Sequence, residues 1–218
     1  MKYSENEEQK NLLKQFLASN GVELSADTLD KLYRFSDLVV ETKEYGNLIS
    51  EKDSQKFLSR HIADSLVPFI HLSQSIRQRG DVSSIRWADM GAGAGCPSFP
   101  LAIVMPEIQF YAVEPRNKRV QFMNFVKDQL HLDNMTVVGK RFETSGLAYL
   151  GFVSCRALST FEKAWERAQP GLARGGQFVT LKSFNNIVHL ENDPSVHIYK
   201  YALPQEEQEY ALVTRGNQ

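Results

Sequence analysis

The sequence predicts an α/β protein in which a mostly parallel seven-stranded sheet, with helices on both faces, follows a helical N-terminal region. Three observations support this prediction. The first third shows helical periodicity and no strand-like alternation. From about residue 85, short apolar segments alternate with helical segments, which is typical of a parallel sheet. A glycine-rich segment lies between the first expected strand and the helix after it.

The N-terminal region is expected to contain three helices. The first has apolar residues at helical spacing, namely Leu12, Leu13, Phe16 and Leu17. Gly21 then marks its end. Ser25 is a suitable N-cap for the second helix, because its hydroxyl can accept a hydrogen bond from the first turn. Asp53 or Ser54 is expected to cap the third.

The second part of the chain supplies the sheet. Seven strands are expected, at residues 85–90, 109–113, 135–138, 151–155, 176–181, 197–202 and 210–214. The last two are expected to form a closing antiparallel pair. Helices are expected at 97–105, 118–130 and 159–169. We therefore divide the chain into a helical N-terminal extension (1–80) that packs on a second domain (81–218).

The composition excludes several classes of protein. The 218 residues include 25 Lys and Arg against 26 Asp and Glu, which argues against a globally basic nucleic-acid binder. The longest apolar runs are far too short to span a bilayer. Two cysteines cannot build a disulfide framework or a zinc site alone. We expect a cytoplasmic monomer that has no bound metal and no membrane partner.

The segment Asp89-Met90-Gly91-Ala92-Gly93-Ala94-Gly95 is the strongest signal for a ligand. It joins a strand to a helix, at the position where an open α/β sheet binds its ligand. Glycines there let the backbone approach a nucleotide closely, and the helix N-terminus offers free N–H groups. Glu114 ends the next strand, where an acid can accept hydrogen bonds from both ribose hydroxyls.

The glycine spacing separates two classes of cofactor. A dinucleotide motif has glycine at its first, third and sixth positions, but the sixth position here is Cys96. A nicotinamide-linked oxidoreductase is therefore disfavoured. Instead, glycine at every second residue after Asp89 resembles motif I of class I S-adenosylmethionine methyltransferases. This resemblance implies that Asp89 or the loop backbone holds the methionine part of S-adenosyl-L-methionine.

Further segments make the resemblance more specific. Arg60-His61-Ile62-Ala63-Asp64-Ser65 and Cys155-Arg156-Ala157 are its most specific parts. The other matching segments are 47–50, 91–97, 99–103, 114–120, 141–143, 175–176 and 181–182. Together these segments resemble the bacterial small-subunit ribosomal RNA guanine-N7 methyltransferases, also called glucose-inhibited division protein B. The matches run from about residue 40 to residue 182, roughly two thirds of the chain.

The resemblance implies a class I methyltransferase fold, S-adenosyl-L-methionine as cofactor, and methylation of guanine N7 in 16S ribosomal RNA or the small ribosomal subunit. The residues expected to bind the cofactor are Asp89, Gly91, Ala92, Gly93, Gly95, Glu114, Phe142, Glu143 and Arg156. Several positions depart from the family pattern, namely Ser98, Phe142, Cys155, Ser183 and the acidic stretch 205–209.

The expected reaction needs alignment rather than proton transfer. Guanine N7 has a free lone pair and no proton, so no general base is required. Arg156 is the expected catalytic residue, because its planar guanidinium can bind a phosphate or the O6 edge of guanine. Its alternative role is a structural salt bridge. The residues expected to contact RNA are Lys118, Arg119, Arg141, Arg156 and Lys182.

Other interpretations stay open at this point. His61 and Asp64 share one helix face, but a metal site would need further ligands nearby. Cys155 has no evident histidine partner, and packing is sufficient to explain it. The chain is alternatively a methyltransferase that acts on another substrate, or a cofactor-binding protein that has lost catalysis and acts at the ribosome.

Overall fold

The computed structural model describes residues 2–46, 48–156 and 159–217. Its seven-stranded sheet has the order β3-β2-β1-β4-β5-β7-β6. The strands are β1 (Arg86–Met90), β2 (Gln109–Val113), β3 (Met135–Val138), β4 (Leu150–Arg156), β5 (Leu172–Ser183), β6 (Val196–Ala202) and β7 (Glu209–Gly216). The first five are parallel to one another, and β7 is antiparallel to β5 and β6. The predicted mostly parallel sheet and closing antiparallel pair are confirmed.

Three aromatic residues, one each in β1, β2 and β4, pack together at the centre of the sheet. Trp87 of β1 is fully buried and stacks on Phe110 of β2 and Phe152 of β4, with ring centroids 5.7 and 4.5 Å apart. These three residues occupy matching positions in adjacent strands. Burial of such large rings contributes much of the free energy of folding.

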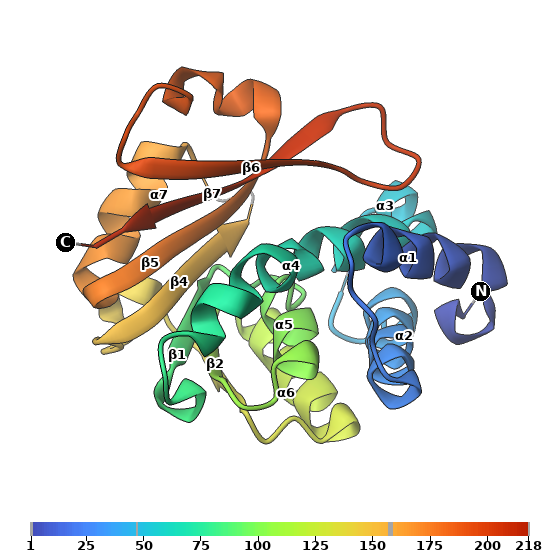
Figure 1. Cartoon of the computed structure of the whole chain (residues 1–218). Coiled ribbons are helices and arrows are strands. Elements are labelled where there is room, and N and C mark those ends of the chain that lie inside the picture. The colour runs from blue at the N-terminus through green and yellow to red at the C-terminus, as the bar shows by residue number, and fades with distance from the viewer. Residues whose placement is uncertain (1, 47, 157–158, 218) are drawn as a thin grey trace.

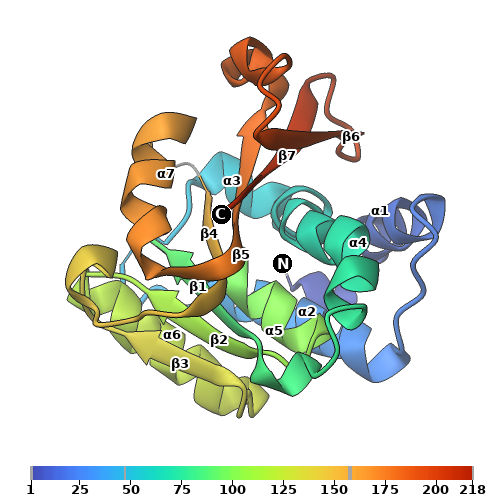
Figure 2. The same ribbon diagram turned by 60° about the vertical axis from the view of Figure 1, so that its left-hand side comes forward.

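Helices cover both faces of the sheet. They are α1 (Glu7–Ser19), α2 (Ala26–Glu41), α3 (Glu51–Gln55), α4 (Ala63–Arg77), α5 (Ser98–Val104), α6 (Asn117–Leu130) and α7 (Phe161–Ala168). α4, α5 and α6 lie on one face, and α7 lies on the other (Figures 1 and 2). Because β1 to β5 are parallel, their carboxyl ends lie along one edge of the sheet. The loops that lead from the strands to the helices begin at this edge.

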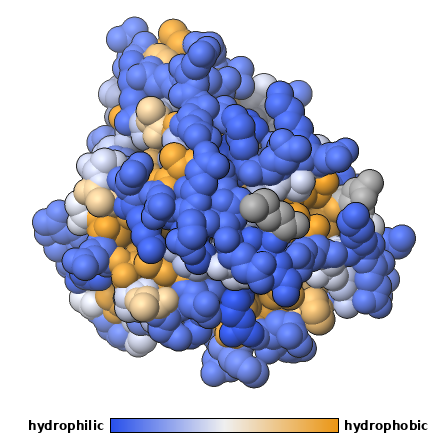
Figure 3. Space-filling model, turned by 90° about the vertical axis from the view of Figure 1, so that its right-hand side faces the viewer, coloured by the Kyte–Doolittle hydropathy of each residue, from blue (hydrophilic) through white to orange (hydrophobic). Residues whose placement is uncertain are grey.

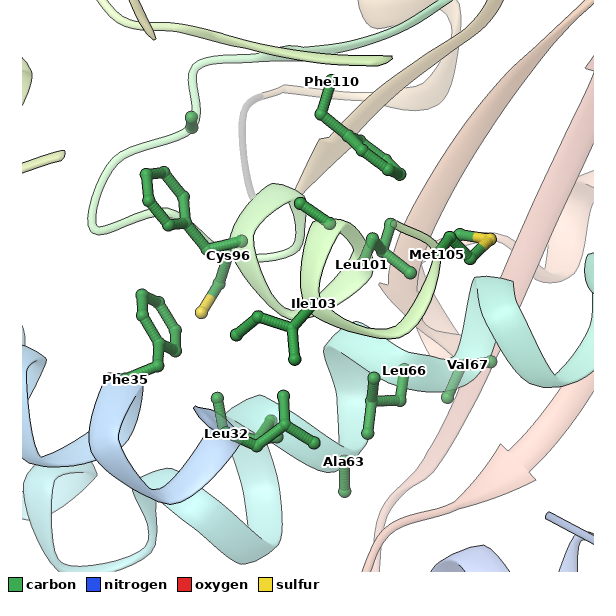
Figure 4. Packing of buried hydrophobic residues seen from close by; sticks show 14 of the residues in the cluster. Leu32, Phe35, Ala63, Leu66, Val67, Cys96, Leu101, Ile103, Met105 and Phe110 are labelled. Carbon is green, nitrogen blue, oxygen red and sulfur yellow. The ribbon is translucent and has the colours of Figure 1, made fainter. Parts of the chain in front are cut away.

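The N-terminal helices continue the hydrophobic core. Figure 4 shows side chains of α2 and α4, among them Leu32, Phe35 and Leu66, that point toward Leu101 and Ile103 of α5. The ring of Phe35 also stacks on Phe99 of α5, with centroids 5.6 Å apart and planes at 9°. One apolar cluster thus contains residues from both sides of the expected division at residue 80.

Two helix starts differ from the sequence prediction. The third helix begins after Ser50, whose hydroxyl accepts a hydrogen bond from the Asp53 backbone N–H at 3.1 Å, so the expected cap at Asp53 or Ser54 was wrong. A π-helix, Phe57–Ile62, then leads directly into α4. α7 begins at Phe161 rather than Ser159, with Thr160 in the N-cap position.

The fifth strand begins four residues earlier than predicted. Gly175 lies inside β5 with φ of +75°, a conformation that glycine adopts without strain. The sequence therefore indicates a turn at a place where the strand continues through an irregular pairing with β4.

Within the described parts of the chain, no helix is long and apolar enough to cross a bilayer. Figure 3 shows one face of the molecule, on which hydrophilic residues predominate and apolar residues gather in separate areas.

Phe35→Ala should lower the free energy of unfolding by about 3–5 kcal/mol, because it leaves a cavity between α2 and α5. Urea unfolding followed by circular dichroism measures this loss. Tyr149→Ala is the control, since Tyr149 is 83% exposed and its replacement should change the free energy by less than about 0.5 kcal/mol. Two separate unfolding transitions in the wild type, or a small effect of Phe35→Ala, would contradict the shared core.

Candidate functional site: two adjoining cavities

The glycine loop after β1 lies directly beside the end of β2. The backbone N–H groups of Gly91 and Ala92 both donate to the Val113 carbonyl, at 2.8 and 3.1 Å. Gly91 has φ of +79°, and Gly95 has φ of +94°. A Cβ at Gly95 would lie only 2.7 Å from the Phe99 ring. The alternating glycines are therefore needed to fold this loop tightly over the strand ends.

Glu114 is held in place by the same loop. It is buried, and its Oε2 accepts a hydrogen bond from the Gly93 N–H at 3.1 Å. Its Oε1 accepts one from the Arg116 N–H at 3.0 Å. The Arg119 guanidinium lies 3.7 Å from Oε2. A carboxylate has about four acceptor positions, so Glu114 keeps capacity for hydroxyl donors.

Asp89, which the family resemblance assigns to the cofactor's methionine part, is buried at the end of β1. Its Oδ2 accepts a hydrogen bond from the Ser98 N–H at 3.3 Å, and its Oδ1 accepts one from the Ser154 hydroxyl at 3.1 Å. Burial raises the pKa of Asp89 to about 6, although both hydrogen bonds oppose this rise. Asp89 thus joins β1, β4 and the start of α5 from within. Ser98, which departs from the family pattern, is fully buried there.

The first cavity, of about 440 Å³, opens at the carboxyl ends of β1 and β2. Six of the predicted site residues line it, namely Gly91, Glu114, Arg119, Arg141, Phe142 and Arg156. The others do not line it, namely Asp89, Ala92, Gly93, Gly95, Lys118, Glu143 and Lys182. Gly93 lies outside the cavity lining, but its N–H donates to Glu114, which does line the cavity. Glu143 forms an ion pair with Arg167.

Arginines dominate the wall of this first cavity. Sequence analysis missed two of the five, Arg116 and Arg167. Arg119, Arg156 and Arg167 each have a carboxylate partner. Among the described residues, no carboxylate oxygen lies within 4.0 Å of a side-chain nitrogen of Arg116 or Arg141. These two guanidinium groups are therefore available to an anion.

A second cavity, of about 480 Å³, adjoins the first, and Arg156 lines both. Its polar lining comes from the π-helix, the start of α4, the ends of β4 and β5 and the turn after β5: Arg60, His61, Asp64, Arg156, Ser159, Lys182, Ser183 and Asn186. Leu181, Leu203 and Tyr210 supply apolar surface. The Arg-His-x-x-Asp-Ser segment could have indicated this cavity, since it carries three of the lining residues.

Arg156 is held by a buried carboxylate. Its Nη1 donates to Asp64 Oδ2 at 3.2 Å, and the Tyr201 hydroxyl donates to Asp64 Oδ1. The side chain of Arg156 is 21% exposed and that of Asp64 12%. The salt bridge that sequence analysis left as an alternative therefore exists, and Arg156 still faces both cavities.

His61 is neutral near pH 7. Burial, together with the nearby Arg156 guanidinium, lowers the pKa of His61 to about 4, although its Nε2 lies 3.2 Å from Asp53 Oδ1. The described residues contain no group of three or more side chains suited to a metal ion. Cys155 is buried and packs inside the sheet, and burial raises the pKa of its thiol to about 11.

The acidic stretch 205–209 connects β6 to β7 and contacts the π-helix region. Glu206 lies 3.5 Å from Lys56 Nζ and 3.8 Å from Arg60 Nε. It also accepts a hydrogen bond from the Tyr210 hydroxyl at 3.3 Å. Of the segments that carry the family resemblance, Asn47 and Ala157 lie outside the described residues.

The raised pKa of Asp89 predicts a pH dependence of stability. The carboxyl binds a proton in the folded chain below about pH 6, whereas its ordinary pKa is 3.8. As the pH rises from 4 to 6, the free energy of unfolding should therefore fall by about 2 kcal/mol relative to Asp89→Asn. Urea titrations at several pH values measure this difference. Asp133→Asn, at an exposed position, is the control for the substitution itself. A difference for Asp89→Asn that stays constant with pH would contradict the prediction.

Comparison with known sequences gives the family. The sequence model described as "GidB: rRNA small subunit methyltransferase G" matches residues 28–211. A ribosomal RNA small subunit methyltransferase G from Staphylococcus epidermidis is 33% identical over 175 residues, which are 78% of this chain and 70% of that protein. The protein of the same name from Staphylococcus haemolyticus is 32% identical over 179 residues, 80% of this chain and 72% of that protein.

Comparison with solved structures gives the fold. An rRNA methylase from Streptococcus thermophilus superimposes with a TM-score of 0.51 at 13% identity, over 68% of this chain and 96% of that one. A predicted O-methyltransferase from Agrobacterium tumefaciens gives 0.51 at 19% identity, over 62% and 74%. The strand order, the loop after β1 and the family match over most of the chain agree, and the chain belongs to the GidB family of rRNA small subunit methyltransferase G proteins.

Proposed function

We propose that this chain uses S-adenosyl-L-methionine to methylate guanine N7 in 16S ribosomal RNA of the small ribosomal subunit. The observation that carries the proposal is the pair of adjoining cavities at the carboxyl ends of the strands, in a chain of this family. One cavity suits the cofactor and the other a base. We also propose the cytoplasm as its compartment, since ribosomal RNA is found there.

The residues of the first cavity fit the cofactor. Glu114 offers buried acceptor positions for the two ribose hydroxyls, and Gly91 lets the backbone approach closely. Phe142 gives an apolar wall for the adenine ring. The cofactor's carboxylate would meet the guanidinium groups of the same cavity.

When bound, the cofactor supplies a methyl group that its positively charged sulfur already activates. Guanine N7 carries a lone pair and no proton, so the chain does not need a general base. This agrees with the surroundings of Arg156, where His61 is neutral and Asp64 already accepts hydrogen bonds from Arg156 and Tyr201. The task of these side chains is to orient the base and to exclude water.

The cationic wall of the first cavity supports an RNA substrate. Arg116 and Arg141 have no carboxylate partner among the described residues, and Lys118 lies two residues after Arg116. A phosphate backbone offers the negative charge that such groups bind. The balanced net charge of −1 is no objection, because the cations are concentrated at one edge of the sheet.

Glu114→Gln should weaken binding of S-adenosylhomocysteine by about 1–3 kcal/mol, because it removes the charge of a hydrogen-bond acceptor. Isothermal titration calorimetry measures the affinity. Glu107→Gln is the matched control, since Glu107 is exposed and lines neither cavity. Unchanged affinity in a folded Glu114→Gln variant would contradict the ribose role.

The activity itself is tested on small-subunit RNA from a strain that lacks this gene. The purified chain should transfer labelled methyl groups from S-adenosyl-L-methionine to that RNA, and nucleoside mass spectrometry should find the label in 7-methylguanosine. Glu114→Gln should transfer less at limiting cofactor. Label in a different nucleoside would overturn the position on the base, and no transfer to either the RNA or intact subunits would overturn the proposed substrate.

A further inference from the structure

The second cavity provides more than room for a base. Its charged groups are Arg60, Arg156, Lys182 and Asp64, since His61 is neutral near pH 7. Both oxygens of Asp64 already accept hydrogen bonds, from Arg156 and from Tyr201. The cavity therefore presents hydrogen-bond donors in excess, and its remaining apolar surface can lie against the faces of a flat ring.

This donor excess distinguishes between the purines. On the edge that carries N7, guanine has a second acceptor, O6, whereas adenine has an amino donor there. Cationic donors therefore favour the N7 edge of guanine and disfavour the N7 edge of adenine. N7 would face the cofactor cavity at the boundary where Arg156 lies, and O6 is next to N7 on the same edge of the base. The end of β5 is paired with Arg156 at this boundary, so its side chains are within reach of O6.

Lys182 is the cation at the end of β5. It follows Leu181, which is paired with Arg156 across the two strands. The Lys182 ammonium donates to the Ser159 carbonyl, and this contact fixes its position. An ammonium has three donors, so two remain for a ligand. Among the described residues, no carboxylate oxygen lies within 4.0 Å of it.

From these contacts we infer that the second cavity is a subsite for a 6-oxopurine base, and that Lys182 determines its specificity by donating to O6. The inference deepens the proposed function and rests on it for the position of N7. Arg156 lies at the entrance between base and cofactor, and Asp64 with Tyr201 positions Arg156. Inosine, which shares O6 and N7 with guanosine, should satisfy the same donor.

Mononucleotides test the base selection without knowledge of the modified nucleotide. Binding of GMP, IMP and AMP is measured by competition with small-subunit RNA, with the cofactor cavity saturated by S-adenosylhomocysteine. All three carry the same phosphate, so a difference among them reports on the base. GMP and IMP should compete at least tenfold more strongly than AMP. Equal competition by all three would overturn the inference.

Variants of Lys182 assign the selection to one side chain. Lys182→Met keeps the apolar part of the side chain and should reduce the preference for GMP over AMP to less than threefold. Lys182→Arg keeps a cationic donor and should retain the preference. Lys31→Met is the control, because Lys31 pairs with Asp27 on α2 and lines neither cavity. A preference unchanged in Lys182→Met would overturn the assignment.

The two proposals can fail separately. A wild type that methylates guanine N7 in RNA but binds GMP and AMP equally would retain the proposed function and lose the subsite. A wild type that prefers GMP and IMP but transfers no methyl group to ribosomal RNA would retain the subsite and lose the proposed function. Affinity for S-adenosylhomocysteine should be unchanged in Lys182→Met, and a loss of that affinity would show that the variant disturbs the first cavity instead.

Discussion

The ion pair between Arg156 and Asp64 is the interaction on which the arrangement of the site depends. It joins the end of β4 to the start of α4, and the Tyr201 hydroxyl brings β6 into the same contact. A largely buried charge is costly unless it is paired and hydrogen-bonded. The pair therefore holds Arg156 against the start of α4 at the sheet edge. Without that position the second cavity would lose one of its walls.

Much of the fold could be predicted because its signals are local. Apolar segments of four to six residues indicated each of the seven strands. The glycine loop and Glu114 could be predicted for the same reason, since the carboxyl ends of β1 and β2 are adjacent in any sheet of this type. The start of β5 could not, because a glycine with positive φ lies inside a strand there.

The parts of the site that escaped prediction arise from tertiary contacts. The burial of Asp89, which comes from the packing of α5 against β1 and β4, could not be predicted from its place before the glycine loop. Arg167 comes from α7, about fifty residues beyond Arg116, and nothing near either residue in the sequence shows that they meet. The acidic stretch after β6 departs from the family pattern in sequence, and Glu206 within it pairs with Lys56 and Arg60 of the same chain.

The central claim is that Arg156 separates a cofactor cavity from a base cavity, and crystallography of the chain with S-adenosylhomocysteine tests it most directly. The account predicts electron density for the ligand in the cavity that Gly91, Glu114 and Phe142 line, and none in the cavity that Lys182 lines. Density in the Lys182 cavity, or a ligand bound elsewhere with the Glu114 cavity empty, would contradict it.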